Sequence, residues 1–241
     1  NARNEWTLLG IGGYDINRLN TDLKNPDDHQ KYLLDWLPES RQWSYTFGTT
    51  FKHYGNNWYH FFVLSRSGLY NKVEKYTGND RHNPKTIDYR SGETENKFRF
   101  EHHRYAANGF KLQVGAGIEY AHYDNTTARR LFAAGEAIDQ YYSRALNMWK
   151  WAVFGQVSRS FFSERLALSL GLRADGCNYT GKTAALYRQI SPRFSFSYAF
   201  DERWSLNGNI GRYYQLPAYT TLGFADAGGV LVNKRNKTGY V

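Results

Sequence analysis

Residues 190–222 read ISPRFSFSYAFDERWSLNGNIGRYYQLPAYTTL, and they contain two segments in which apolar and polar side chains alternate. In the first segment, aromatic residues at every second position from Phe194 to Phe200 alternate with small residues such as Ser195. After a tight turn that begins at Asp201, the alternation resumes. A period of two gives a strand one apolar and one polar face. The stretch therefore predicts a β-hairpin whose apolar face is covered either by a second sheet or by lipid.

The composition of the chain favours lipid. Aromatic residues make up 17% of the 241 residues, yet the mean hydropathy is only −0.70, and no apolar run is long enough for a transmembrane helix. This combination is typical of a membrane β-barrel, whose aromatic side chains form girdles at the two interfaces. The net charge of +9 comes from scattered Lys and Arg without a recognition motif, so no nucleic-acid partner is expected. The single cysteine, Cys177, excludes an internal disulfide and a cysteine-cluster metal site.

The same alternation recurs along the chain and predicts nine strands, at 5–18, 41–54, 58–75, 94–106, 110–124, 147–160, 166–179, 190–200 and 203–215. Short connections are expected at 55–57, 107–109, 163–165 and 201–202, and long ones at 19–40, 76–93, 125–146, 180–189 and from 216 onward. Short and long connections therefore alternate. Outer-membrane barrels sort their connections in this way, because periplasmic turns are short and extracellular loops are long. This pattern orients the chain, with the turn at 201–202 on the periplasmic side and residues 214–217 at the outer rim.

Strand length agrees with a barrel, since most segments exceed the roughly 9–11 residues that a tilted spanning strand needs. We therefore expect an all-β fold, part of a large antiparallel transmembrane β-barrel. Two alternatives remain open at this point. One is a passive porin or structural barrel, and the other is a soluble β-sandwich that binds carbohydrate.

Four stretches, in this order, carry a resemblance to a known family: WAVFGQVS at 151–158, LSLGLRAD at 168–175, ISPRF at 190–194, and WSL at 204–206 followed by GRYYQLP at 211–217. Together they resemble the barrel of TonB-dependent outer-membrane transporters, in the style found in Bacteroidetes. The resemblance implies a barrel of roughly 22 strands with a plugged lumen. Residues 1–241 would all belong to the barrel domain, with the plug and the terminal strands outside this chain.

The resemblance also implies a function and partners. The protein would sit in the outer membrane of a Gram-negative cell, bind a scarce solute at the surface and import it with TonB-derived energy. The expected partners are a TonB-type energy-coupling protein, outer-membrane lipid, a small-molecule or oligosaccharide cargo and a surface lipoprotein. No enzymatic activity and no cofactor are expected, since no catalytic triad order or phosphate-binding glycine loop occurs in the sequence.

Two sets of residues are candidates for contact with the cargo or with the lumen. Arginine can clamp a carboxylate or phosphate, and tyrosine offers a flat surface to sugars or aryl groups. The predicted loop 125–146 holds such residues at Arg129, Arg130, Tyr141 and Tyr142. Four charged residues fall on the small-residue face and are expected to point into the lumen: Glu119, Lys150, Arg173 and Asp175. No metal site is expected, because the adjacent His102 and His103 would point to opposite faces of a strand.

Overall fold

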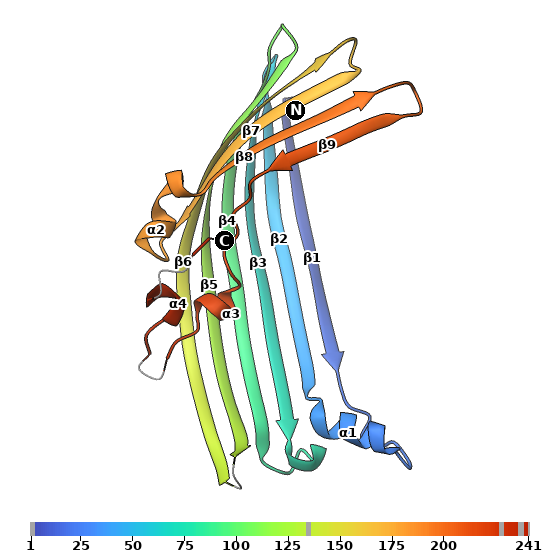
Figure 1. Cartoon of the computed structure of the whole chain (residues 1–241), viewed down its shortest axis with the longest axis vertical. Helices are drawn as coiled ribbons and strands as arrows, with labels where there is room; N and C mark the ends of the chain where they lie inside the picture. The colour runs from blue at the N-terminus through green and yellow to red at the C-terminus, as the bar shows by residue number, and fades with distance from the viewer. Residues whose placement is uncertain (1–2, 134–135, 227–228, 236–238, 241) are drawn as a thin grey trace.

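A computed structural model of the chain describes residues 3–133, 136–226, 229–235 and 239–240. Nine strands form one antiparallel sheet in which each strand pairs with its neighbours in chain order (Figure 1). The strands are β1 (Asn4–Asn17), β2 (Glu39–Tyr54), β3 (Trp58–Tyr76), β4 (Lys85–Tyr105), β5 (Phe110–Ala133), β6 (Glu136–Phe161), β7 (Leu166–Cys177), β8 (Ile190–Ala199) and β9 (Ser205–Gly211). The prediction of an all-β antiparallel fold with nine strands is confirmed.

The connections hold short helices, and most of these lie at one end of the sheet or beside it. They are α1 (Asp28–Trp36), η1 (Thr77–Asn79), α2 (Gly181–Ala184), η2 (Leu186–Arg188), α3 (Tyr219–Leu222) and α4 (Val232–Arg235). Asp27 caps α1, because its side chain accepts a hydrogen bond from the Gln30 backbone and its own backbone donates to the Gln30 side chain. Within the described ranges, no helix has the length and apolar character that a membrane crossing requires.

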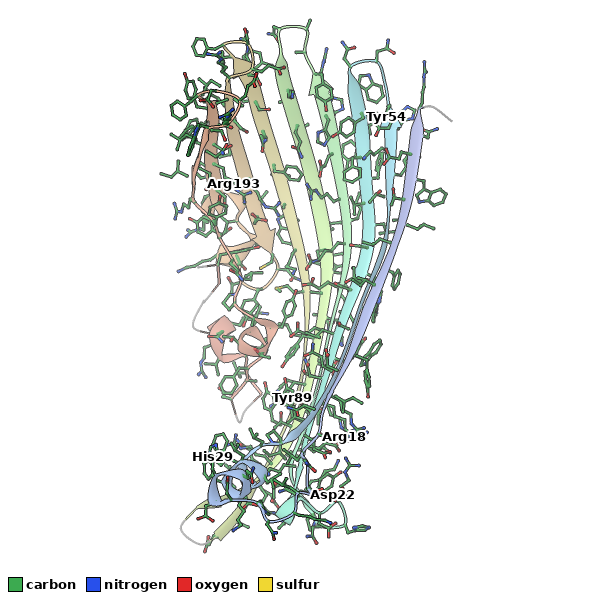
Figure 2. The ribbon with its side chains drawn as sticks, turned by 90° about the vertical axis from the view of Figure 1, so that its right-hand side faces the viewer. Arg18, Asp22, His29, Tyr54, Tyr89 and Arg193 are labelled. Atoms are coloured by element: carbon green, nitrogen blue, oxygen red, sulfur yellow. The ribbon has the colours of Figure 1, made fainter. Side chains whose placement is uncertain are left out.

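Short turns join the strands at the other end. Gly109 closes one of them with a φ of +81°, a backbone conformation that disfavours other residues. We call the end of the sheet that carries these turns the short-turn end. In Figure 2, Tyr54 marks the short-turn end and His29 of α1 marks the opposite end.

The sheet has two unlike faces. The outward face is apolar and open, as Leu64 (57% exposed), Leu170 (58%) and Ile210 (72%) illustrate. The inner face carries Glu119 and Lys150, which are paired across β5 and β6, and residues 212–226, 229–235 and 239–240 fold back against it. We call these three described stretches the return segment, and both views place it on the same side of the sheet (Figures 1 and 2).

The apolar part of the outward face is a band rather than the whole surface. On β5 the outward side chains are apolar from Phe110 to Ile118, and from His122 to Arg130 they are polar except at Ala128. On β6 they are apolar from Val157 back to Trp149, and from Asn147 back to Asp139 they are polar except at Ala145. A band of this height matches the roughly 9–11 residues that a tilted strand needs to cross a bilayer. The far halves of β5 and β6 therefore lie beyond the band, on the side away from the short turns.

Two predicted loops are wrong in their extent. Residues 85–93 belong to β4, and most of 125–146 belongs to β5 and β6, which pair as far as Ala133 with Glu136. The strict alternation of long and short connections breaks here. These residues lie beyond the apolar band, where both faces are wet, so the strands continue without an alternation in hydrophobicity.

The last strand is shorter than predicted. β9 ends at Gly211 rather than near residue 215, after which the chain leaves the sheet. Leu216, which was predicted to lie at the outer rim, packs against the buried cluster of the inner face, as does Tyr219.

Candidate functional site: the inner face of the sheet

Four charged side chains of alternating sign form a cluster on the inner face. Lys97 of β4, Glu119 of β5 and Lys150 of β6 are direct neighbours across the strands, and Glu95 lies next to them on β4. Lys97 Nζ is 2.6 Å from Glu95 and 3.4 Å from Glu119. Lys150 Nζ is 3.1 Å from Glu95 and also contacts Glu119. We call Glu95, Lys97, Glu119 and Lys150 the wall cluster.

The sequence of β4 explains why so much charge lies on one face. Charged or titratable residues occupy every second position from Glu93 to His103, and a period of two puts all of them on the inner face. Nearer the short-turn end, the same row supplies Glu101, which is 3% exposed. Its carboxylate lies 2.6 Å from His103 and accepts a hydrogen bond of 2.8 Å from Gln113. The inner face is therefore lined by paired charges over much of its height.

The return segment binds to the wall cluster through Tyr219. The Tyr219 hydroxyl accepts a hydrogen bond of 2.6 Å from Lys150 and donates one to Glu95. Burial, followed by the hydrogen bond to Glu95, raises the pKa of Tyr219 above its ordinary value. The hydroxyl thus keeps the proton that it donates to the carboxylate.

An apolar core holds the same segment in place. Leu222 is fully buried and packs with Tyr123, Met148 and Cys177 of the sheet. The Tyr179 hydroxyl donates a hydrogen bond of 2.7 Å to the Leu222 carbonyl. The return segment is therefore fixed by packing as well as by polar contacts, since a buried leucine stabilises a fold by about 1.5–3 kcal/mol relative to an exposed one.

An open cavity of about 660 Å³ lies between the return segment and the inner face. Its charged lining is balanced, with four acidic side chains and four basic ones: Glu93, Glu95, Glu119, Asp175, Lys97, Arg99, Lys150 and Arg173. Tyr214, Tyr219 and Tyr240 add aromatic surface. Such a lining suits a polar solute that is held by hydrogen bonds and ring contacts.

The architecture is that of a sheet with an apolar band outside and a polar, charged wall inside. A family model described as TonB dependent receptor-like, beta-barrel, matches residues 2–237, which is nearly the whole chain. The chain belongs to this family. Members of the family are transporters and not enzymes, which confirms the prediction that the chain is not an enzyme.

Solved structures with the same fold include other TonB-dependent receptor barrels. The ferric enterobactin receptor PfeA of Pseudomonas aeruginosa, as a G324V mutant, matches 92% of this chain with 16% identity and a TM-score of 0.61. The outer membrane transporter YddB of Escherichia coli matches 89% with 14% identity and a TM-score of 0.55. This chain covers 32% of the first structure and 30% of the second, so it spans about a third of their length. A comparison with curated proteins found no match.

The four residues predicted to face the lumen of this TonB-dependent receptor barrel all line the cavity. Glu119 and Lys150 belong to the wall cluster. Arg173 and Asp175 of β7 form a separate ion pair of 2.7 Å between residues two apart on one strand. Contact with a solute or with a plug stays a prediction for all four.

The four residues predicted to bind ligand from a loop lie on strands instead, and the structure does not gather them. Arg129 and Tyr142 fall on the inner face, while Arg130 and Tyr141 fall on the outward face. Arg130 pairs with Asp139 at 2.7 Å. Tyr142 donates a hydrogen bond of 2.8 Å to the Gly223 carbonyl and so holds the return segment. The placement of these residues in a loop is wrong, and their contact with ligand remains untested.

Sequence reasoning missed three residues of the site. For Glu95 and Lys97 a signal exists in the sequence, because charged residues at every second position of β4 lie on one face. Tyr219 follows a proline in an irregular segment, where no periodicity reports its position. Among the described residues, no three His, Cys, Asp or Glu side chains gather in a way that would hold a metal ion.

Tyr219→Phe is expected to loosen the return segment by about 2 kcal/mol, because it removes one hydroxyl that contacts two charged groups. Hydrogen exchange of the amides in residues 212–226, measured on the full-length protein in detergent, should rise accordingly. Tyr213→Phe is the matched control, since the Tyr213 side chain is 59% exposed. Equal exchange in the two variants would show that the Tyr219 hydroxyl does not anchor the segment.

Proposed function

We propose that the whole protein is an active transporter of the outer membrane, which binds a scarce solute at the cell surface and imports it with TonB-derived energy. Membership of the TonB-dependent receptor family supports this function. The observation that carries the proposal is the pairing of an apolar outward band with a charged inner wall around a cavity. A barrel in lipid with a wet, lined interior is the arrangement that solute passage requires.

The rest of the machinery would lie in parts of the protein beyond these 241 residues. The matched structures are about three times as long as this chain. We propose that residues 1–241 form part of the barrel domain, that a plug fills the lumen, and that a TonB-type protein pulls on a segment near the plug. The wall cluster and the Arg173–Asp175 pair would then face the plug and the solute path.

The cargo is proposed as a class rather than as a compound. Two of the similar structures are a ferric enterobactin receptor and the ferric citrate transporter FecA, the latter at 10% identity and a TM-score of 0.53. A ferric chelate is therefore one candidate. The balanced charge and the tyrosines of the cavity also suit a neutral glycan.

The test uses the full-length gene in a Gram-negative host. The protein should fractionate with the outer membrane and migrate differently on a gel before and after boiling. Uptake of labelled ferric chelates and oligosaccharides is then compared in matched strains with and without the energy-coupling protein. Uptake that disappears without coupling supports the proposal. Uptake that persists would identify a passive porin, and a soluble periplasmic product would contradict the membrane location.

A further inference from the structure

The outward face carries two arginines near the short-turn end that have no acidic partner. Arg104 lies one residue before the end of β4, and Arg159 lies two residues before the end of β6. In the part of the chain that the structure describes, neither forms an ion pair. Arg159 lies over the rings of Phe110 and Phe161, with its guanidinium carbon 4.8 Å and 5.0 Å from their centroids. Neither charge is therefore neutralised by a carboxylate of the described residues.

Two arginines of the inner face differ in this respect. On the inner face, Arg99 pairs with Glu101 and Arg173 pairs with Asp175. By strand alternation, no Asp or Glu among the described strand residues faces outward within five residues of a short turn, because Glu5 and Glu101 both point inward. An arginine at the edge of an apolar band that has no carboxylate beside it keeps its guanidinium open to water and to lipid headgroups.

The neighbouring side chains fix the depth of Arg104 in the bilayer. The Trp58 and His60 rings are 4.6 Å apart, and the His60 and His102 rings are 5.1 Å apart. Such amphipathic rings gather where hydrocarbon meets the headgroups. Two residues further from the turn, the phenylalanine pair Phe62 and Phe100 begins the apolar band. Arg104 lies two residues nearer the turn than His102, which puts it at the level of the lipid headgroups.

We propose that Arg104 and Arg159 bind the phosphates of anionic phospholipids in the leaflet next to the short turns. A guanidinium matches a phosphate with two parallel hydrogen bonds. The two arginines are two strands apart, about 10 Å, and two residues apart along the strands, about 7 Å, so each would hold its own phosphate. Each basic residue near an anionic membrane surface strengthens the binding of the protein to anionic lipid about fivefold. The inference rests on the barrel standing in a bilayer, as proposed above, and does not depend on energy coupling or on cargo.

The experiment measures lipid preference in the full-length protein. Detergent-solubilised protein is titrated with phosphatidylglycerol or phosphatidylcholine, and bound lipids are counted by native mass spectrometry. The wild type should prefer phosphatidylglycerol, and R104Q and R159Q should each reduce that preference about fivefold, with the double variant reducing it further. K111Q is the matched control. Lys111 lies at the same end of β5, is exposed, points to the inner face and forms no ion pair among the described residues.

Several results would overturn the proposal. They are an unchanged preference in the double variant, an equal loss in K111Q, or binding of lipopolysaccharide but not phosphatidylglycerol at these arginines.

Heat-modifiable gel migration verifies that each variant is folded. If the double variant does not fold, R104K and R159K replace it, because they keep the charge and should keep most of the preference. A lysine variant that loses as much phosphatidylglycerol preference as the matching single variant, R104Q or R159Q, would contradict a role for the charge. A barrel that does not transport with TonB-derived energy would still prefer phosphatidylglycerol. The failure of one proposal can therefore be distinguished from the failure of the other.

Discussion

Leu170→Arg should lower the free energy of unfolding of the full-length protein from a bilayer by about 2–4 kcal/mol. Leu170 is 58% exposed on the outward face of β7, and it lies between Val157 of β6 and Phe194 of β8. An arginine there would replace an apolar side chain of the outward band. Urea-driven unfolding in lipid vesicles, followed by the loss of heat-modifiable migration, measures the change.

The neighbouring residue provides the control. Ser169 points to the inner face, opposite Ser158 and Ser195, so Ser169→Arg introduces the same side chain into a polar environment. We expect its effect to stay below about 1 kcal/mol, as for substitutions on the wet side of a barrel. If Ser169→Arg destabilises the protein more than Leu170→Arg does, the inner and outward faces have been exchanged.

Leu222→Ala should release the return segment from the inner face. The Leu222 side chain is 0% exposed and packs with Tyr123, Met148 and Cys177. Truncating a buried leucine to alanine lowers stability by about 2–5 kcal/mol, because apolar contacts are lost and a cavity remains. Leu222 lies outside the nine strands, so the loss should appear as local opening of the return segment. Limited proteolysis of the full-length protein in detergent should show faster cleavage there.

Val230→Ala, in the same segment, separates this effect from a general loss of order. Val230 is 49% exposed, and its truncation should leave the cleavage rate nearly unchanged. Cleavage that is equally slow in Leu222→Ala and in the wild type would mean that the polar contacts of Tyr219 and Tyr142 hold the segment without the apolar core.

The outward band was predictable from the sequence because lipid imposes a strict pattern. Every second residue of β5 from Phe110 to Ile118 must be apolar, and the period of two shows this directly. Beyond the band that constraint disappears, since water wets both faces. Residues 125–133 and 136–146 keep their backbone pairing, but their side chains no longer alternate in hydrophobicity. The predicted loop there was a strand pair that carries no such signal.

The inner face was predictable only in part. The alternation of side chains along a strand placed Glu119 and Lys150 on one face, and the structure pairs them with each other. The contact between Tyr219 and Glu95 joins residues 124 positions apart. It depends on how an irregular segment folds back, and neither alternation nor turn chemistry reports that path.

The pairing of β5 with β6 beyond the apolar band has a consequence for antibody recognition. Arg130 and Asp139 lie opposite each other on paired strands, joined by a bidentate contact of 2.7 and 2.8 Å, and Tyr141 beside them is 72% exposed. An antibody that approaches from this side meets a rigid surface built from two strands. Immunisation with a linear peptide from residues 125–133 would therefore raise sera that bind the denatured chain better than the folded protein. An epitope made of both strands would be recognised only on the folded protein.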